Sequence, residues 1–130
     1  MSAGGNGLVY LASPYSDPDP AVEAGRFRAA CRRAARMTEE GLLVFSPIAH
    51  SHPICVLGGC AADFAAWERF DRAMLDCCQR MAVLTLPGWE QSRGVTAEVG
   101  IAGAMGLDIE YLDPTPEELW EASGVFIGET

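Results

Sequence analysis

The sequence contains no lysine: all nine of its basic residues are arginine, and eighteen acidic residues give a formal net charge of -9. Such an acidic excess opposes any affinity that depends on neutralising a phosphate backbone, so we expect no nucleic-acid partner. Binding of a small anionic ligand remains possible. Bidentate guanidinium groups or backbone N–H groups, rather than ammonium groups, would hold it.

Long apolar runs are also missing, because no stretch of about 18 hydrophobic residues occurs in the chain. Residues 1–7 have neither the basic nor the apolar part of a secretory signal, so we expect a cytoplasmic protein without a membrane partner. Five cysteines are an odd number, which disfavours a disulfide framework. The 130 residues, 49% of them hydrophobic and without internal repeats, predict one domain over residues 1–130.

Short apolar runs alternate with segments of helical periodicity. The patterns predict strands over residues 8–12, 42–45, 81–86 and 109–112, with 125–127 as a candidate fifth strand. Helices are expected over residues 20–41, 63–79 (with Asp63 as N-cap), 94–105 and 116–122. Residues 47–60, rich in Pro, Gly and His, are expected to form a loop.

This alternation indicates a single-domain α/β protein with a doubly wound, Rossmann- or flavodoxin-like sheet of four to five mainly parallel strands flanked by helices. Ligands of such sheets bind beyond the carboxyl ends of the strands. We therefore expect residues 13–17, 46–60 and 87–94 to rim one site.

Asp71 interrupts the apolar face of the second long helix, whose other members are Phe64, Trp67, Met74, Leu75 and Cys78. Taking a carboxylate out of water costs several kcal/mol unless the group is paired or hydrogen-bonded. Asp71 therefore needs a partner. It is either a structural group, held by an arginine or a cap on a neighbouring loop, or an active-site acid.

Glu98 lies early in the helix predicted over residues 94–105, where N–H groups and the helix dipole favour an ionised carboxylate. On these grounds alone, Glu98 has an ordinary structural role, in which its negative charge interacts with the helix dipole. Its neighbours are all small, however, which predicts that something approaches the carboxylate closely; they are Ala97, Gly100, Ala102, Gly103, Ala104 and Gly106.

Three separate segments resemble the nucleoside 2-deoxyribosyltransferase superfamily: Tyr10-Leu11-Ala12-Ser13-Pro14, Asp71, and Ser92-Arg93-Gly94-Val95-Thr96-Ala97-Glu98-Val99-Gly100. In that family a strand of the form Y-L-A-G-P opens the fold, an Asp lies on the second helix, and a G-[TV]-x-x-E-[ILV]-G segment carries a nucleophilic Glu. The resemblance covers about residues 8–112.

Position by position, the resemblance implies that Glu98 attacks C1′ of the sugar, Tyr10 orients that carboxylate, and Asp71 contacts the sugar or helps to protonate the departing base. Departure of the base leaves an oxocarbenium-like sugar, which an ionised carboxylate captures before water or a second base attacks from the opposite side. Neither a cofactor nor a metal is expected. Family members are usually dimers or larger, so the resemblance also implies a homo-oligomer, a dimer or tetramer.

The sequence departs from the transferase pattern at two positions. Ser13 replaces the usual Gly, and Ser92 stands where base-exchanging members tend to carry Asp. Serine there resembles the branch that hydrolyses nucleoside 5′-monophosphates, because a hydroxyl group beside the N–H groups of Arg93 and Gly94 can donate to a phosphate. Water is then the favoured acceptor, with base exchange as the alternative. Arg93 is a candidate phosphate fork or a solvated side chain.

His50 and His52, with Cys55 and Cys60, have a spacing that a zinc ion can use, but they lack paired Cys-x-x-Cys ligands. We favour substrate-facing or loop-ordering histidines. Among the aromatic residues, Tyr15 and Trp89 are candidates to stack a base, whereas Trp67 is assigned to the core.

Three function classes stay open. The first is an N-glycosidase or deoxyribosyltransferase acting on a nucleoside or nucleotide, and the second is a nucleotide-binding or sensing module without turnover. The third is a metal-stabilised interaction domain built on the histidine segment.

Overall fold

The computed structural model describes residues 7–60 and 64–125, and its centre is a parallel sheet of four strands. The strands are β1 (Leu8–Ala12), β2 (Leu43–Phe45), β3 (Arg80–Leu84) and β4 (Asp108–Leu112). Their order is β2-β1-β3-β4, and every neighbouring pair runs parallel. This arrangement confirms the predicted doubly wound α/β fold.

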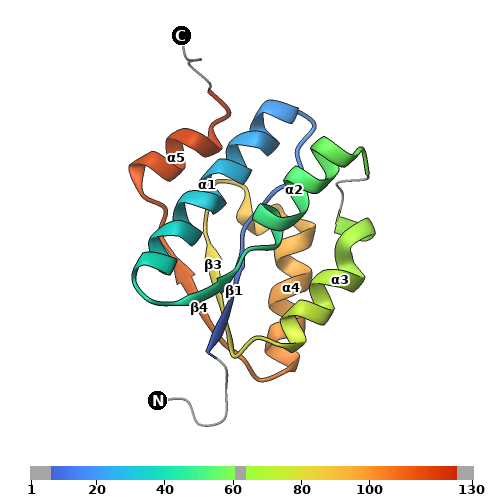
Figure 1. The fold of residues 1–130 in the computed structure, drawn as a ribbon, viewed down its shortest axis with the longest axis vertical. Coiled ribbons are helices and arrows are strands. Elements are labelled where there is room, and N and C mark those ends of the chain that lie inside the picture. The colour runs from blue at the N-terminus through green and yellow to red at the C-terminus, as the bar shows by residue number, and fades with distance from the viewer. Residues whose placement is uncertain (1–6, 61–63, 126–130) are drawn as a thin grey trace.

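Helices cover both faces of the sheet (Figure 1). Helices α1 (Pro20–Glu39) and α5 (Pro116–Ala122) lie on one side, and α3 (Phe64–Asp76) and α4 (Arg93–Ala104) lie on the other. Helix α2 (Pro47–Gly58) follows β2 directly and packs against α1 and β1. A short 3-10 turn, η1 (Trp89–Gln91), precedes α4.

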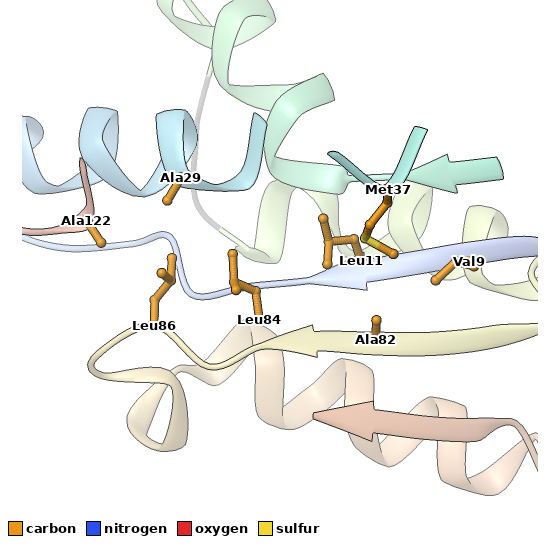
Figure 2. Close-up of a cluster of buried hydrophobic side chains, with 8 residues drawn as sticks. All are labelled: Val9, Leu11, Ala29, Met37, Ala82, Leu84, Leu86 and Ala122. Atoms are coloured by element: carbon orange, nitrogen blue, oxygen red, sulfur yellow. The ribbon is translucent and has the colours of Figure 1, made fainter. Parts of the chain in front are cut away.

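Alternate residues of the central strands enter two separate cores, because successive side chains of a strand point to opposite faces. Val9 and Leu11 of β1 join Ala82 and Leu84 of β3 in the core beneath α1 and α5 (Figure 2). Tyr10 and Ala12, by contrast, join Met81 and Val83 beneath α3 and α4. Tyr10 is therefore directed towards α4, the helix that carries Glu98.

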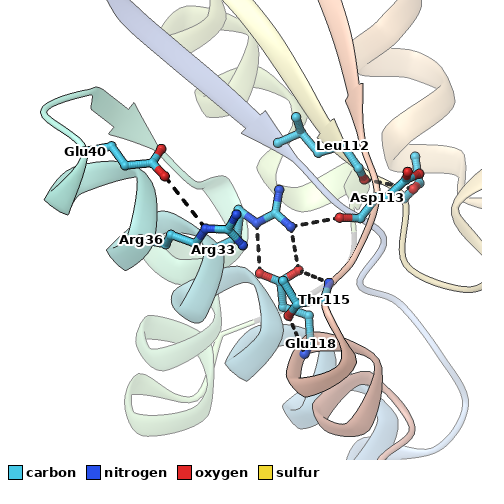
Figure 3. Close-up of polar contacts among 8 residues, drawn as sticks. Arg33, Arg36, Glu40, Leu112, Asp113, Thr115 and Glu118 are labelled. Carbon is cyan, nitrogen blue, oxygen red and sulfur yellow. Dashed lines mark hydrogen bonds and ion pairs between the residues drawn. The ribbon is translucent and has the colours of Figure 1, made fainter.

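Helix α5 is joined to α1 by a buried ion pair that the sequence patterns did not predict. Arg33 donates two hydrogen bonds to the Glu118 carboxylate, at 2.9 and 2.8 Å, and a third to the backbone carbonyl of Asp113 (Figure 3). Glu118 also accepts from the Thr115 N–H in a capping box that begins α5. These contacts stand on the opposite face of the sheet from Glu98.

The prediction of a loop over residues 47–60 is wrong, because residues 47–58 form helix α2. Ser46 caps the helix by accepting from the Ala49 N–H at 3.1 Å, and Pro47 occupies the first position, where its missing N–H costs nothing. Gly59, with φ 82°, ends the helix in the left-handed conformation. The helix buries Pro47, Ser51 and Cys55 along one face, and this short stripe carries little of the apolar periodicity that would have revealed it.

Other boundaries differ by a few residues. Helix α1 ends at Glu39 rather than at residue 41, α3 ends at Asp76 rather than at 79, and β3 ends at Leu84 rather than at 86. The predicted N-cap Asp63 and residues 126–127 of the candidate fifth strand lie outside the described residues, and Val125 is not in a strand. Over the part of the chain that is described, none of the helices combines the length and the apolar character needed to cross a bilayer.

Candidate active site

A cavity of about 390 Å³ opens at the carboxyl ends of β1 and β3, where the strand order reverses. All three segments predicted to rim one site contribute to it: Ser13, Tyr15 and Ser16 after β1, Ile48 and Ser51 on α2, and residues 91–94 before and at the start of α4. Helix α3 adds Ala65, Trp67 and Asp71, and α4 adds Glu98. The three segments predicted to rim one site therefore border the same cavity.

Glu98 is buried at the cavity, with 5% of its surface exposed, and accepts a 2.5 Å hydrogen bond from the Tyr10 hydroxyl group to its Oε2. Tyr10 is fully buried, and burial together with the charge of Glu98 raises its pKa well above the ordinary value. The phenol therefore keeps its proton and acts only as a donor to the carboxyl group. This contact holds Glu98 in one orientation.

The position of Glu98 in α4 predicts an ionised carboxylate at neutral pH, but its buried surroundings oppose the charge. Burial raises the pKa of Glu98 to about 8, the Tyr10 hydrogen bond lowers it in part, and the Asp71 charge raises it further. Glu98 is the sixth residue of α4 and shares a buried stripe with Val95 and Ala102, so it lies beyond the first turn, where the helix dipole acts most strongly.

Asp71 is 7% exposed, and its Oδ1 has no hydrogen-bond partner among the described residues. No arginine pairs with it there, although the structural interpretation required such a partner. Burial raises the pKa of Asp71 to about 6. An unsatisfied buried carboxyl group facing a cavity favours a ligand-binding role.

Two serines add polar groups to the cavity. The Ser13 hydroxyl group is buried without a partner among the described residues, so a ligand can satisfy it. Ser92 is the N-cap of α4, and its Oγ accepts from the Val95 N–H at 3.1 Å, which leaves its own hydrogen available to a ligand. Arg93 and Gly94, which follow, also line the cavity, as predicted.

His50 and His52, which were predicted to bind substrate, do not line the cavity and instead support its wall. The Tyr15 hydroxyl group and His52 Nδ1 are hydrogen-bonded at 2.6 Å, and the His52 ring stacks on Phe27 of α1 at 4.3 Å. His50 stacks instead on Phe70 of α3, with 4.8 Å between ring centroids. Of the predicted residues on this wall, only Tyr15 lines the cavity.

The two tryptophan assignments were wrong. Trp89 packs against Tyr111 and the core beneath α4 and is not among the residues that line the cavity. Trp67, assigned to the core, lines the cavity and donates its indole N–H to Cys55 Sγ at 3.2 Å. Trp67 is therefore the tryptophan placed where a planar group can bind.

His50 and His52 cannot bind one zinc ion together, because both lie in helix α2. Two residues along an α-helix differ by about 200° in direction, so His50 and His52 point to different neighbours. Among the residues that the structure describes, no group of three or more His, Cys, Asp or Glu side chains is placed to hold a metal ion.

The small residues around Glu98 do not serve the cavity, contrary to expectation. Ala97, Gly100 and Ala104 line a separate shallow groove between α3 and α4, together with the ion-paired Glu68 and Arg72. Ala102 is buried against the sheet. The close approach to the Glu98 carboxyl group comes from Tyr10 and the cavity.

Arg26 of α1 joins two rims of the cavity, which the sequence patterns did not predict. Its guanidinium group donates to the backbone carbonyls of Tyr15 (3.2 Å) and Ser16 (2.9 Å) after β1, and of Pro87 (3.3 Å) after β3. Gly88 has φ 92°, and a Cβ there would lie 2.9 Å from Arg26 Nη2. The glycine thus gives the guanidinium group room between the rims.

The family model "Domain of unknown function (DUF1937)" matches residues 7–114. The chain belongs to this family. None of the curated proteins matches the sequence significantly. The DUF1937 match begins just before β1 and ends just after β4, so it includes every residue that lines the cavity and excludes α5.

Within the DUF1937 domain, the cavity residues that sequence reasoning missed are Ser16, Ile48, Ser51, Ala65, Trp67 and Gln91. A helical assignment for residues 47–58 would have placed Ile48 and Ser51 one turn apart on one face. Trp67 and Asp71, four residues apart on α3, carried the same signal. That spacing predicts that the indole ring and the carboxyl group face one space.

Proposed function

We propose that the protein cleaves the N-glycosidic bond of a nucleoside or nucleoside 5′-monophosphate through a covalent intermediate on Glu98. The observation that carries this proposal is the pair of buried carboxyl groups, Glu98 and Asp71, that face one cavity with the Tyr10 hydroxyl group bound to Glu98. A cavity of about 390 Å³ is within the usual range of small-molecule sites.

The two carboxyl groups together supply the nucleophile and the acid. The pKa of Asp71 is raised to about 6 and that of Glu98 to about 8, so the two groups together hold one proton near neutral pH. The higher pKa places this proton on Glu98 in the free protein; in the reactive form we place it on Asp71, with Tyr10 donating to the ionised Glu98. Glu98 is then the ionised nucleophile, and Asp71 can protonate the departing base.

The growing positive charge on the sugar favours the same proton arrangement. As the bond to the base breaks, an oxocarbenium-like sugar attracts an ionised Glu98 and lowers its pKa. Glu98 forms a bond to C1′ while the base leaves with the proton from Asp71. Water then attacks C1′ from the opposite face, and Asp71 takes up its proton, which restores both groups with retention at C1′.

We propose water as the favoured acceptor and a 5′-monophosphate as the favoured substrate. The Ser92 hydroxyl group stands at the first turn of α4, in the cavity, beside Arg93 and Gly94. A helix N-terminus with a donor hydroxyl group suits a phosphate. Base exchange between nucleosides is the alternative activity. The net charge of -9 favours it, because an acidic protein repels the phosphate dianion of a 5′-monophosphate.

Release of free base from a panel of ribonucleosides, 2′-deoxyribonucleosides and their 5′-monophosphates tests the activity. We expect Glu98→Ala to lower the rate by several orders of magnitude, and Glu90→Ala, an exposed glutamate before α4, to leave it unchanged. Base release by Glu98→Ala at the wild-type rate contradicts the nucleophile assignment. Tight nucleotide binding without release by the wild type identifies a sensing module instead.

We also propose a homo-oligomer, a dimer or tetramer, in the cytoplasm. Val56 and Leu57 of α2, the helix that forms one wall of the cavity, are 63% and 86% exposed, and burial against a second copy would remove this apolar surface from water. Light scattering coupled to size-exclusion chromatography measures the mass in solution. A monomer at micromolar concentration contradicts this assembly.

A further inference from the structure

Two cysteine sulfurs lie next to one another at the end of α2. The Cys60 thiol group donates to Cys55 Sγ across 2.8 Å, and neither residue is in a disulfide. Cys55 is buried in the last turn of the helix, whereas Cys60 is exposed beyond the Gly59 cap. A disulfide bond is about 2.05 Å long, so the sulfurs need to approach by less than about 1 Å.

The other cysteines are arranged differently. Cys77 and Cys78 are adjacent in sequence, but their thiol groups donate to two backbone carbonyls, those of Ala73 and Met74. Cys31 lies half-buried on α1, on the far side of the molecule's sheet from α3. Cys55 and Cys60 are thus the pair whose side chains already meet, and the left-handed turn at Gly59 is what returns the chain towards Cys55.

We infer that Cys55 and Cys60 are a reversible modification site that a low-molecular-weight disulfide, such as oxidised glutathione, converts to an intramolecular disulfide. The Cys60 thiolate attacks one sulfur of the reagent, a mixed disulfide forms, and one glutathione leaves. The Cys55 thiolate then attacks the Cys60 sulfur, and the second glutathione leaves. Two cysteine thiols lose two electrons and two protons, and the reagent gains them as two glutathione thiols.

The position of Cys60 decides the order of these steps. Only an exposed sulfur can meet the reagent, and the buried Cys55 is already in contact to resolve the mixed disulfide. The hydrogen bond to Cys55 raises the pKa of the Cys60 thiol, so the exchange should be followed above the ordinary thiol pKa of about 8.5, where more of Cys60 is thiolate.

Trp67 connects this pair to the cavity. Its indole N–H donates to Cys55 Sγ at 3.2 Å, and its side chain forms part of the cavity wall. When Cys55 Sγ moves towards Cys60 and becomes a disulfide sulfur, this hydrogen bond weakens, and the indole loses one of the contacts that orient it, beside its ring contacts with His50 and Phe70. Oxidation outside the cavity therefore changes the wall on which a ligand binds.

Intact mass and peptide mapping after incubation with oxidised glutathione test the modification directly. We expect the wild-type protein to lose two hydrogen atoms, to show a linked Cys55–Cys60 peptide, and to recover its mass in dithiothreitol. Cys60→Ser, a change at an exposed position, should lose this product, and Cys77→Ser should keep it. A stable glutathione adduct without closure, a link between other cysteines, or an unchanged mass overturns the inference.

A second measurement follows the wall of the cavity without any assumption about activity. In a variant with Trp89→Phe and Trp120→Phe, Trp67 is the remaining tryptophan, and its fluorescence should change on oxidation and return on reduction. The same variant with Cys60→Ser should show no change. Oxidation that is complete by mass but leaves the fluorescence unaltered overturns the coupling to Trp67.

The effect on turnover rests on the proposed function. With a substrate found in the base-release panel, we expect kcat/KM to fall about fivefold in the oxidised protein, the order that one neutral hydrogen bond contributes, and to recover on reduction. Disulfide formation with unchanged kcat/KM overturns the link to the site. If no substrate is found, the mass and fluorescence results still decide the modification and its coupling to Trp67.

Discussion

The carboxyl groups of Asp71 and Glu98 face one cavity from two neighbouring helices, α3 and α4, and each occupies the buried stripe of its helix. Asp71 shares its stripe with Leu75, as Glu98 does with Val95 and Ala102. No arginine neutralises either group among the described residues. The negative charge of Asp71 therefore acts directly on Glu98 and raises its pKa.

This pair predicts a bell-shaped pH dependence of kcat/KM. Turnover needs one proton on the pair, so activity should fall below about pH 6, where both groups are protonated, and above about pH 8, where both are ionised. Tyr10→Phe removes the hydrogen bond that lowers the pKa of Glu98, so the alkaline limb should move to higher pH. A flat profile from pH 5 to 9, measured with a chemical step that limits the rate, contradicts the paired roles.

Glu98→Gln should make the folded protein more stable while it abolishes turnover. The pKa of Glu98 rises from 4.5 to about 8 on folding, so its contribution to stability is full below pH 4.5 and is lost as the pH rises to about 8. A glutamine needs no proton, so its advantage over the wild type should grow over this range to several kcal/mol, at about 1.4 kcal/mol per pKa unit.

Urea unfolding at pH 5 and pH 8.5 measures this difference. Glu90→Gln, which changes an exposed glutamate, is the control and should show no such pH dependence. An advantage of Glu98→Gln that shrinks as the pH rises would show that the glutamate is ionised in the folded protein.

Asp71→Asn should lower kcat by two or more orders of magnitude with little loss of stability, because the amide is isosteric but cannot donate an acidic proton. Asp76→Asn, an exposed change on the same helix, is the matched control. Glu118→Gln gives the opposite comparison, since it leaves the buried Arg33 charge without its partner and should reduce the free energy of unfolding by about 3 kcal/mol. If Asp71→Asn unfolds easily and keeps its turnover, Asp71 is a structural residue.

Ser92→Asp should reverse the substrate preference from 5′-monophosphates to nucleosides. Aspartate is as good an N-cap as serine, so the cap of α4 and the melting temperature should be retained while a negative charge enters the cavity. The ratio of kcat/KM for matched nucleoside and 5′-monophosphate pairs, with and without a competing free base, measures the effect. A wild type that prefers nucleosides, or that incorporates the added base faster than water, supports the transferase alternative.

Arg26→Met should raise KM more than it lowers kcat, because Arg26 orders the rims of the cavity and does not line it. Losing three hydrogen bonds to two rims leaves the segments after β1 and β3 less ordered before the substrate binds, which we expect to cost about tenfold in KM. Arg36→Met, an exposed arginine on the same helix, is the control. An effect confined to kcat would mean that Arg26 acts on the reacting groups.

The sheet and most helices were predictable because their signals are local. Buried parallel strands appear as short apolar runs, and α1 and α3 repeat apolar residues every three or four positions. Helix α2 was missed for the same reason. Its buried face consists of a proline, a serine and a cysteine, so neither its composition nor its periodicity resembles that of an amphipathic helix.

The sequence by itself determined the doubly wound fold, the edge of the sheet at which the cavity opens, and the conflict created by a carboxyl group on the apolar face of α3. Only the tertiary structure decided which side chains reach the cavity, and how they are ionised. The direction of a side chain depends on how its helix packs: helical geometry separates His50 from His52, and the orientation of α3 brings Trp67 into the wall. The pKa of Glu98 depends on water excluded by β1, α3 and α4 together, which no single segment of the chain specifies.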